Sequence, residues 1–250
     1  MRVLKLTIEY DGTDLVGWQR QPEGISIQGL LEDALAAFEG GPVMVHGAGR
    51  TDAGVHALAQ IASVALSAGH DANAIQRGLN AVLPPSVRVV SVEDAPSGFH
   101  ARFDATGKIY EYRVVNAPFV SPFLVRYAWH VPQRLDVDAM RIAAGALVGR
   151  HDFAVFQGAG SDVRDTVRTI ESIEWRGDVG ALGNAAPLTV TITADGFLRH
   201  MVRSIVGTLV EVGAGRWPPG EVAAILASRD RSRVGRTAPP QGLFLVRVRY

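Results

Sequence analysis

The sequence predicts a mixed α+β fold built from two halves that share one order of elements, β-α-β-β-α-β. Three observations predict it. Stretches of alternating apolar and polar residues, typical of half-buried strands, recur along the whole chain. Stretches with apolar residues every three to four positions, typical of amphipathic helices, lie between them. Turn residues, mainly glycine and proline, separate these stretches in both halves.

The first half contains four predicted strands and two predicted helices. Ser26 can cap a helix whose apolar positions run to Phe38, and the glycines and proline at 40–42 end it. Asp71 opens the second helix, and the two prolines at 84–85 end that segment. The predicted strands of this half are 4–10, 43–46, 60–66 and 87–92.

The second half repeats this order of elements without repeating the sequence. Its predicted strands are 105–115, 167–175, 188–192 and 243–250, and its predicted helices are 137–147 and 199–212, with a short extra helix starting at Pro218. The order is the ferredoxin-like one. We expect the two halves, 1–98 and 99–250, to divide near Pro96 and to join their antiparallel sheets around a central cleft.

Composition limits the class of protein. Apolar residues make up 47% of the 250 residues, which is ample for a packed core. The absence of cysteine excludes disulfides, thiolate metal sites and thiol catalysis. No apolar run approaches the ~20 residues that span a bilayer, and the N-terminus leads into a strand pattern without a signal peptide. These features predict a soluble, cytoplasmic protein.

The net charge is zero, but the charges are unevenly distributed. Residues 1–98 carry 6 basic and 11 acidic side chains, whereas residues 199–250 carry 9 arginines against 3 acids. A basic patch on a neutral protein is the electrostatic footprint expected for nucleic-acid binding. Compositional bias is the alternative, because 23 of the 25 basic residues are arginine. Candidates for phosphate contact are four closely spaced arginines: Arg229, Arg231, Arg233 and Arg236.

A glycine-rich stretch, residues 45–56, dominates the first half. Its three glycines surround Arg50, Thr51 and Asp52, which indicates an exposed loop between two rigid elements, where functional residues gather. It is not a phosphate-binding loop, since no Gly-Lys-Ser/Thr follows, and its glycine spacing does not fit the dinucleotide fingerprint. The spacing of its histidines gives little support to a metal site. A turn in which Asp52 bonds its own backbone is the plain alternative.

Two stretches of the second half also carry candidate functional side chains. Tyr110 and Tyr112 share one face of a predicted strand, where tyrosine pairs more often serve packing than catalysis. Arg203 lies between apolar positions of a predicted helix, and an arginine there needs a carboxylate partner.

The string Gly-Arg-Thr-Asp-Ala-Gly-Val-His at 49–56 resembles the catalytic signature of the tRNA pseudouridine synthase A (TruA) family. Further stretches resemble other signatures of the same family, and together they extend the resemblance over almost the whole chain. These stretches are 17–21, 99–112, 197–207 and 242–245.

The resemblance implies an isomerase with the pseudouridine synthase fold. Such an enzyme converts uridine to pseudouridine at positions 38, 39 and 40 of the tRNA anticodon stem-loop, and it does so as a homodimer. The reaction breaks the N1–C1′ bond, turns the base and joins C5 to C1′. It implies no metal, redox group or small-molecule cofactor.

The resemblance also implies roles for individual residues. Asp52 is the catalytic carboxylate, and Arg203 pairs with it to keep it ionised. The target base must be flipped out of its stem, and Arg50 fills the vacated space. Tyr110 stacks on the flipped base or transfers the C5 proton. The remaining predicted substrate contacts are the apolar wall Leu245 and two residues of the 17–21 loop, Arg20 and Gln21.

Two alternatives from other classes stay open at this point. One is a non-catalytic RNA-binding protein made of paired ferredoxin-like modules, although the aromatic signature of RNA-recognition strands is absent. The other is an enzyme that uses Asp52 and Arg203 on a small metabolite. The basic C-terminal segment argues against that second alternative.

Overall fold

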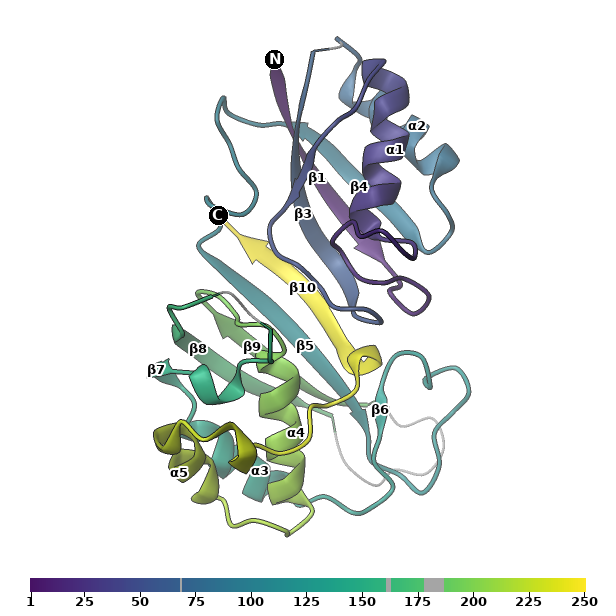
Figure 1. Cartoon of the computed structure of the whole chain (residues 1–250). Coiled ribbons are helices and arrows are strands. Elements are labelled where there is room, and N and C mark those ends of the chain that lie inside the picture. The colour runs from purple at the N-terminus through teal and green to yellow at the C-terminus, as the bar shows by residue number, and fades with distance from the viewer. Residues whose placement is uncertain (68, 161–162, 178–186) are drawn as a thin grey trace. The chain divides into compact units, whose positions relative to one another are not determined.

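The computed structural model describes residues 1–67, 69–160, 163–177 and 187–250. The chain forms two compact units. The first unit comprises Met1–Thr106 together with the C-terminal residues Phe244–Tyr250, and the second comprises Gly107–Leu243. Each unit combines a mostly antiparallel sheet with helices (Figure 1), so the predicted α+β class is confirmed.

The sheet of the first unit is centred on two long strands. β1 (Arg2–Tyr10) and β3 (His56–Leu66) pair antiparallel, β4 (Val87–Asp94) pairs with the other side of β1, and β2 (Val45–Gly47) pairs with β3. The last strand, β10 (Leu243–Arg249), runs parallel to the start of β3. The apolar residues of β1 alternate as predicted, and those that face the core are fully buried: Leu4, Leu6 and Ile8.

Two helices pack side by side in this unit (Figure 1). In α1 (Ile27–Glu39) the Ser26 side chain accepts a hydrogen bond from the amide of Gly29, and Gly40 ends the helix in the left-handed conformation with φ of +73°. In α2 (Ala72–Val82) the Asp71 side chain accepts one from the amide of Ala74. Both predicted N-caps and the glycine stop of the first helix are confirmed.

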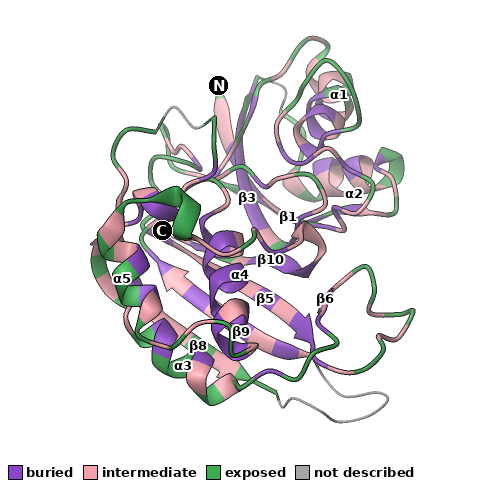
Figure 2. Ribbon diagram, turned by 60° about the horizontal axis from the view of Figure 1, so that its bottom comes forward, coloured by how far each residue is buried: buried purple, intermediate pink, exposed green. Residues whose placement is uncertain are grey.

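The second unit has a four-stranded antiparallel path: β5 (Gly107–Val115), β9 (Leu188–Ala194), β8 (Val167–Arg176) and β7 (Gly149–Asp152). β6 (Trp129–His130) adds a short parallel pairing to β5. The helix α4 (Met201–Gly213) is buried along most of its length (Figure 2). The other helices among the described residues of this unit are α3 (Val137–Gly145), α5 (Glu221–Ser228) and three single turns, η1 (Ala154–Phe156), η2 (Arg231–Arg233) and η3 (Pro240–Gly242).

The structure differs most from the predicted elements in three places, and the other bounds shift by two residues or fewer. β3 begins at His56, four residues before the predicted start, so it follows the glycine-rich stretch directly. β6 and β7 were not predicted, because strands of two and four residues are too short to show a period. The extra helix begins at Glu221 instead of Pro218, because Pro219 disfavours the helical conformation for the residue before it.

The loop Gly17–Trp18 clamps the glycine-rich stretch through its backbone. Gly17 lies opposite Asp52 in an antiparallel bridge, and the Trp18 amide donates to the Thr51 carbonyl oxygen at 3.0 Å. Gly17 has φ of +99°, and a Cβ there would lie 2.5 Å from that same oxygen. The Trp18 ring covers Gly47, where an added Cβ would lie 2.4 Å from the ring. Glycine is therefore required on both sides of this contact.

The clamp yields a stability prediction based on two glycines that both have positive φ. Gly40→Ala meets open space and should lower the free energy of unfolding only by the left-handed strain, about 1–2 kcal/mol. Gly17→Ala should lower it by a further ~1–3 kcal/mol, because its Cβ overlaps the Thr51 carbonyl. Urea titrations of both variants measure the difference. Equal losses would contradict the clamp.

Candidate active site

The backbone around Arg50 and Asp52 is held from both sides by the first unit's sheet. The Ala48 amide donates to the Ile61 carbonyl at 2.7 Å, and the Gln60 side-chain amide donates to the Gly49 carbonyl at 2.9 Å. Just beyond, the hydroxyls of Thr51 and Tyr10 lie 2.8 Å apart in a buried pair. Burial raises the pKa of Tyr10 well above its usual value, so this tyrosine stays neutral and serves as a structural anchor.

Asp52 lies at the start of a tight turn that presents its side chain. Its carbonyl accepts from the Val55 amide at 3.2 Å, and Gly54 takes the positive φ that the third turn position requires. The Asp52 side chain is half-buried, whereas the neighbouring Arg50 is exposed. The loop therefore holds a carboxylate at the edge of water with an exposed guanidinium two residues away.

His56, at the end of the glycine-rich stretch, is a core residue. It is 1% exposed and its ring stacks on Phe244 at 4.6 Å between centroids. Its Nδ1 accepts a hydrogen bond from the Gly12 amide at 3.1 Å. Asp11 Oδ1 lies 3.1 Å from the same Nδ1. This geometry gives His56 a structural role.

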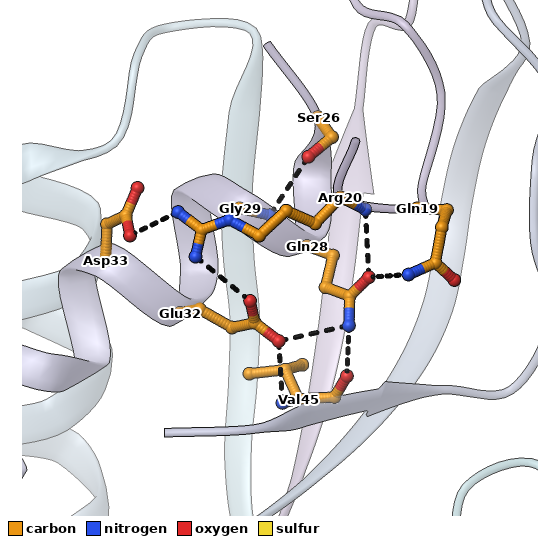
Figure 3. Close-up of polar contacts among 8 residues, drawn as sticks. All are labelled: Gln19, Arg20, Ser26, Gln28, Gly29, Glu32, Asp33 and Val45. Atoms are coloured by element: carbon orange, nitrogen blue, oxygen red, sulfur yellow. Dashed lines mark hydrogen bonds and ion pairs between the residues drawn. The ribbon is translucent and has the colours of Figure 1, made fainter. Parts of the chain in front are cut away.

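Arg20 lies in a polar network that links the clamp loop, α1 and β2 (Figure 3). Its guanidinium binds Glu32 at 3.2 Å and Asp33 at 2.5 Å. Gln21, the other predicted substrate contact of this loop, donates its side-chain amide to the Val16 carbonyl at 3.1 Å. In the described structure the side chains of both residues hold the loop that contains Gly17 and Trp18.

Two residues of α1 that the sequence did not single out complete this network. Glu32 is 9% exposed, and its carboxylate accepts from the Val45 amide at 3.2 Å. Gln28 accepts from the amide of Arg20 at 2.9 Å and donates to the Val45 carbonyl at 3.1 Å. No local signal separates them from the solvent-facing polar residues of α1, because their partners lie far away in the sequence.

In the second unit, Tyr110 lies on β5 opposite Ile192 of β9 and is 7% exposed. Its ring meets the edge of Phe197 at 5.0 Å between centroids. Tyr112 shares that face as predicted, but it is fully buried and its hydroxyl donates to the Pro239 carbonyl at 2.6 Å. Burial raises the pKa of Tyr112 well above its usual value. The two tyrosines therefore differ in access to water.

Arg203 lies in the first turn of α4 and binds the segment 236–238, which crosses this helix and is called the strap below. Its Nε donates to the Ala238 carbonyl at 2.8 Å, and the Ala238 amide returns a bond to the Arg203 carbonyl at 3.0 Å. The strap crosses α4 at Gly207, where an added Cβ would lie 1.7 Å from the Arg236 carbonyl oxygen. Asp52 and Arg203 belong to different units, and their pairing stays a prediction.

Leu245 and the basic stretch complete the set of predicted site residues. Leu245 is fully buried on β10, opposite Ala57 of β3. Three of the four arginines have partners within the second unit: Arg229 binds Asp152 at 2.8 Å, Arg233 binds Glu221 at 2.6 Å, and Arg231 donates to the Val155 carbonyl at 3.1 Å. Burial lowers the pKa of Arg231.

Arg236 is the member of the basic stretch best suited to bind a phosphate. It is exposed, and its guanidinium lies 4.7 Å from the centroid of the Trp129 ring. Within the described ranges no carboxylate pairs with it. Stacking on an aromatic face holds a guanidinium in place without neutralising it.

No group of three or more histidine, aspartate or glutamate side chains in the described parts of the chain is arranged to hold a metal ion. No helix among those residues is long and apolar enough to cross a membrane.

Comparison with known proteins covers the chain from end to end. A family model described as tRNA pseudouridine synthase matches residues 6–104 and 143–250, which include Asp52, Arg203 and Leu245 but not Tyr110. The tRNA pseudouridine synthase A of Syntrophotalea carbinolica is 46% identical, over 100% of this chain and 97% of the relative.

Two further relatives named tRNA pseudouridine synthase A are as similar. That of Myxococcus xanthus is 48% identical, over 99% of this chain and 91% of the relative. That of Geobacter sulfurreducens is 45% identical over the full length of both proteins. With a matching family model over most of its length and full-length relatives at this identity, the chain belongs to the tRNA pseudouridine synthase family.

Proposed function

We propose that this chain isomerises uridine to pseudouridine in the anticodon stem-loop of tRNA, at positions 38, 39 and 40. The observation that carries the proposal is the fixed, half-buried Asp52 at the turn of a clamped loop, within a chain of this family. The reaction needs a carboxylate that reaches the sugar and a site that holds the detached base. It consumes no oxidant, because the C5–C1′ bond replaces the N1–C1′ bond and the proton lost from C5 is balanced by one gained at N1.

Asp52 is the group that acts on the sugar in this proposal. Its carboxylate attacks C1′ or removes the 2′ proton, which releases the base at N1. The base turns and C5 bonds to C1′ as the Asp52–C1′ bond breaks, or as the 2′ proton returns in the other route. The C5 proton then leaves to water and N1 takes up a proton. The Arg203 guanidinium keeps the carboxylate ionised through a bidentate contact, which its planar fork of donors allows.

The other predicted residues take substrate-side roles. Arg50 is exposed beside Asp52, as a residue that fills the space left by a flipped base must be. Leu245 of β10, which lies opposite Ala57 of β3, forms an apolar wall of the substrate pocket. Tyr110 transfers the C5 proton. Arg20 and Gln21 act on the substrate through the loop they brace.

The proposal extends to architecture and assembly. We take both halves, 1–98 and 99–250, to be ferredoxin-like, which the all-antiparallel order β4-β1-β3-β2 of the first unit supports. The enzyme acts as a homodimer in the cytoplasm, and the tRNA crosses both subunits.

Asp52→Asn tests the activity directly. With a tRNA transcript that carries tritium at uridine C5, the purified wild-type protein should release tritium to water without added cofactor. Asp52→Asn should abolish release and leave tRNA binding nearly intact, because a nucleophile contributes to the chemical step more than to ground-state binding. Asp14→Asn, an exposed carboxylate in the same unit, serves as the control. Release by Asp52→Asn within about tenfold of wild type would rule out Asp52 as the nucleophile.

Arg203 should be needed for both stability and turnover. Arg203→Ala leaves the proposed carboxylate partner uncompensated, at roughly 3–5 kcal/mol if the pair is buried. Arg203→Lys should recover stability only in part, since an ammonium cannot copy the bidentate fork. Thermal unfolding and tritium release are measured together. Arg233→Ala, which removes an ion pair with Glu221 of the same unit, is the control. A Lys variant with full activity would overturn the assignment.

Tyr110→Phe separates stacking from proton transfer. If the hydroxyl moves the C5 proton, the variant should bind tRNA and break the glycosidic bond but lose about 10²–10⁴ in the rate of tritium release. Tyr112→Phe removes a hydroxyl bonded to the Pro239 carbonyl, so it should cost about 1 kcal/mol of stability and keep turnover. Full activity of Tyr110→Phe would assign Tyr110 to stacking alone, which requires only the ring.

A further inference from the structure

An exposed stack of rings lies in the first unit. The centroids of His46 and His100 are 4.8 Å apart with the ring planes at 34°, and those of His100 and Phe103 are 4.3 Å apart at 33°. The Arg102 guanidinium lies 5.8 Å from the centroid of the Phe103 ring. Phe103 is 75% exposed and His46 is also exposed. We refer to His46, His100 and Phe103 as the ring stack.

The turn that carries two of these rings is firmly built. Nδ1 of His100 accepts from the amide of Arg102 at 3.1 Å, and the His100 amide donates to the Asp104 carboxylate at 2.8 Å. Because Nδ1 is an acceptor, the neutral ring carries its proton on Nε2. Nε2–H makes no hydrogen bond within residues 1–67, 69–160, 163–177 and 187–250, which leaves a donor available beside the exposed ring.

The ring stack lies next to the start of the catalytic loop. His46 belongs to β2, which leads into the glycine-rich stretch, and it pairs with Ser63 of β3. The Ser63 hydroxyl accepts from the Ala101 amide at 3.1 Å. The Tyr250 hydroxyl donates to the Ala101 carbonyl at 2.8 Å. These bonds fix the 100–103 turn against the same strands that position Asp52.

A single exposed phenylalanine has no special meaning on a protein surface. A set of rings that ends in a mostly exposed phenylalanine, with a guanidinium near that ring and a hydrogen-bond donor beside it, has a specific chemistry. Unstacked RNA bases stack on such faces, and guanidinium groups bind the adjoining phosphates. The arrangement matches a nucleotide better than a peptide, because a nucleotide offers both a flat base for the ring and a phosphate for the guanidinium.

We propose that the ring stack is a second RNA contact of this chain, at which an unstacked base packs on the exposed ring of Phe103. Arg102 binds a neighbouring phosphate, and His100 Nε2–H donates to the base or sugar. The proposal rests on the proposed function only in taking that RNA to be the tRNA substrate.

The test uses the full chain in the Asp52→Asn background, so that binding is measured without turnover. Phe103→Leu keeps apolar volume but removes the π-face, and Phe103→Trp keeps the face. Phe103→Leu should weaken the binding of a tRNA transcript by about 5- to 150-fold without changing the salt dependence, while Phe103→Trp should bind like the parent. Arg102→Gln should flatten the slope of log affinity against log salt by about one unit.

Phe123→Leu is the matched control, because Phe123 is 86% exposed in the second unit. It should leave affinity unchanged. Unchanged affinity in Phe103→Leu, or an equal loss in Phe123→Leu, would overturn the proposal, and so would a failure of the parent to bind tRNA. Tritium release is measured separately on the wild-type chain. Binding that depends on Phe103 in a chain that releases no tritium would support the ring stack and refute the proposed function.

Discussion

The structure of the site depends on one backbone contact, the bridge between Gly17 and Asp52. Two segments of chain run side by side there with no room for a Cβ at Gly17, and the Trp18 ring lies where a side chain at Gly47 would be. A bond between the Trp18 amide and the Thr51 carbonyl completes it. The main chain that carries the Asp52 carboxylate is thereby fixed, whichever partner the side chain binds.

Polar groups on neighbouring elements hold this contact in place. Glu32 and Gln28 bind the backbone of β2 from α1, and Tyr10 binds Thr51 from β1. A carboxylate fixed before substrate arrives pays little of its ordering cost at the moment of reaction. The loop is thus a fixed part of the first unit that presents the two proposed functional groups, Asp52 and Arg50, towards water.

Local signals in the sequence were sufficient for much of the fold. The caps Ser26 and Asp71 were predicted correctly, because capping depends only on the next few residues. Partners distant in sequence were not predictable. The ion pairs that Arg229 and Arg233 make with Asp152 and Glu221 could not be seen in the sequence. In the same way, the buried role of Glu32 and the layering of His46 on His100 exist only once separate segments are brought together.

Amide hydrogen exchange in the free protein tests the central claim, that the loop carrying Asp52 is fixed before substrate binds. The informative amides are those of Trp18 and Ala48, which donate to the Thr51 and Ile61 carbonyls. The account predicts that both exchange as slowly as the paired amides of β3, because the clamp opens only when the sheet does. Exchange of either amide at the rate of an unstructured peptide would contradict it.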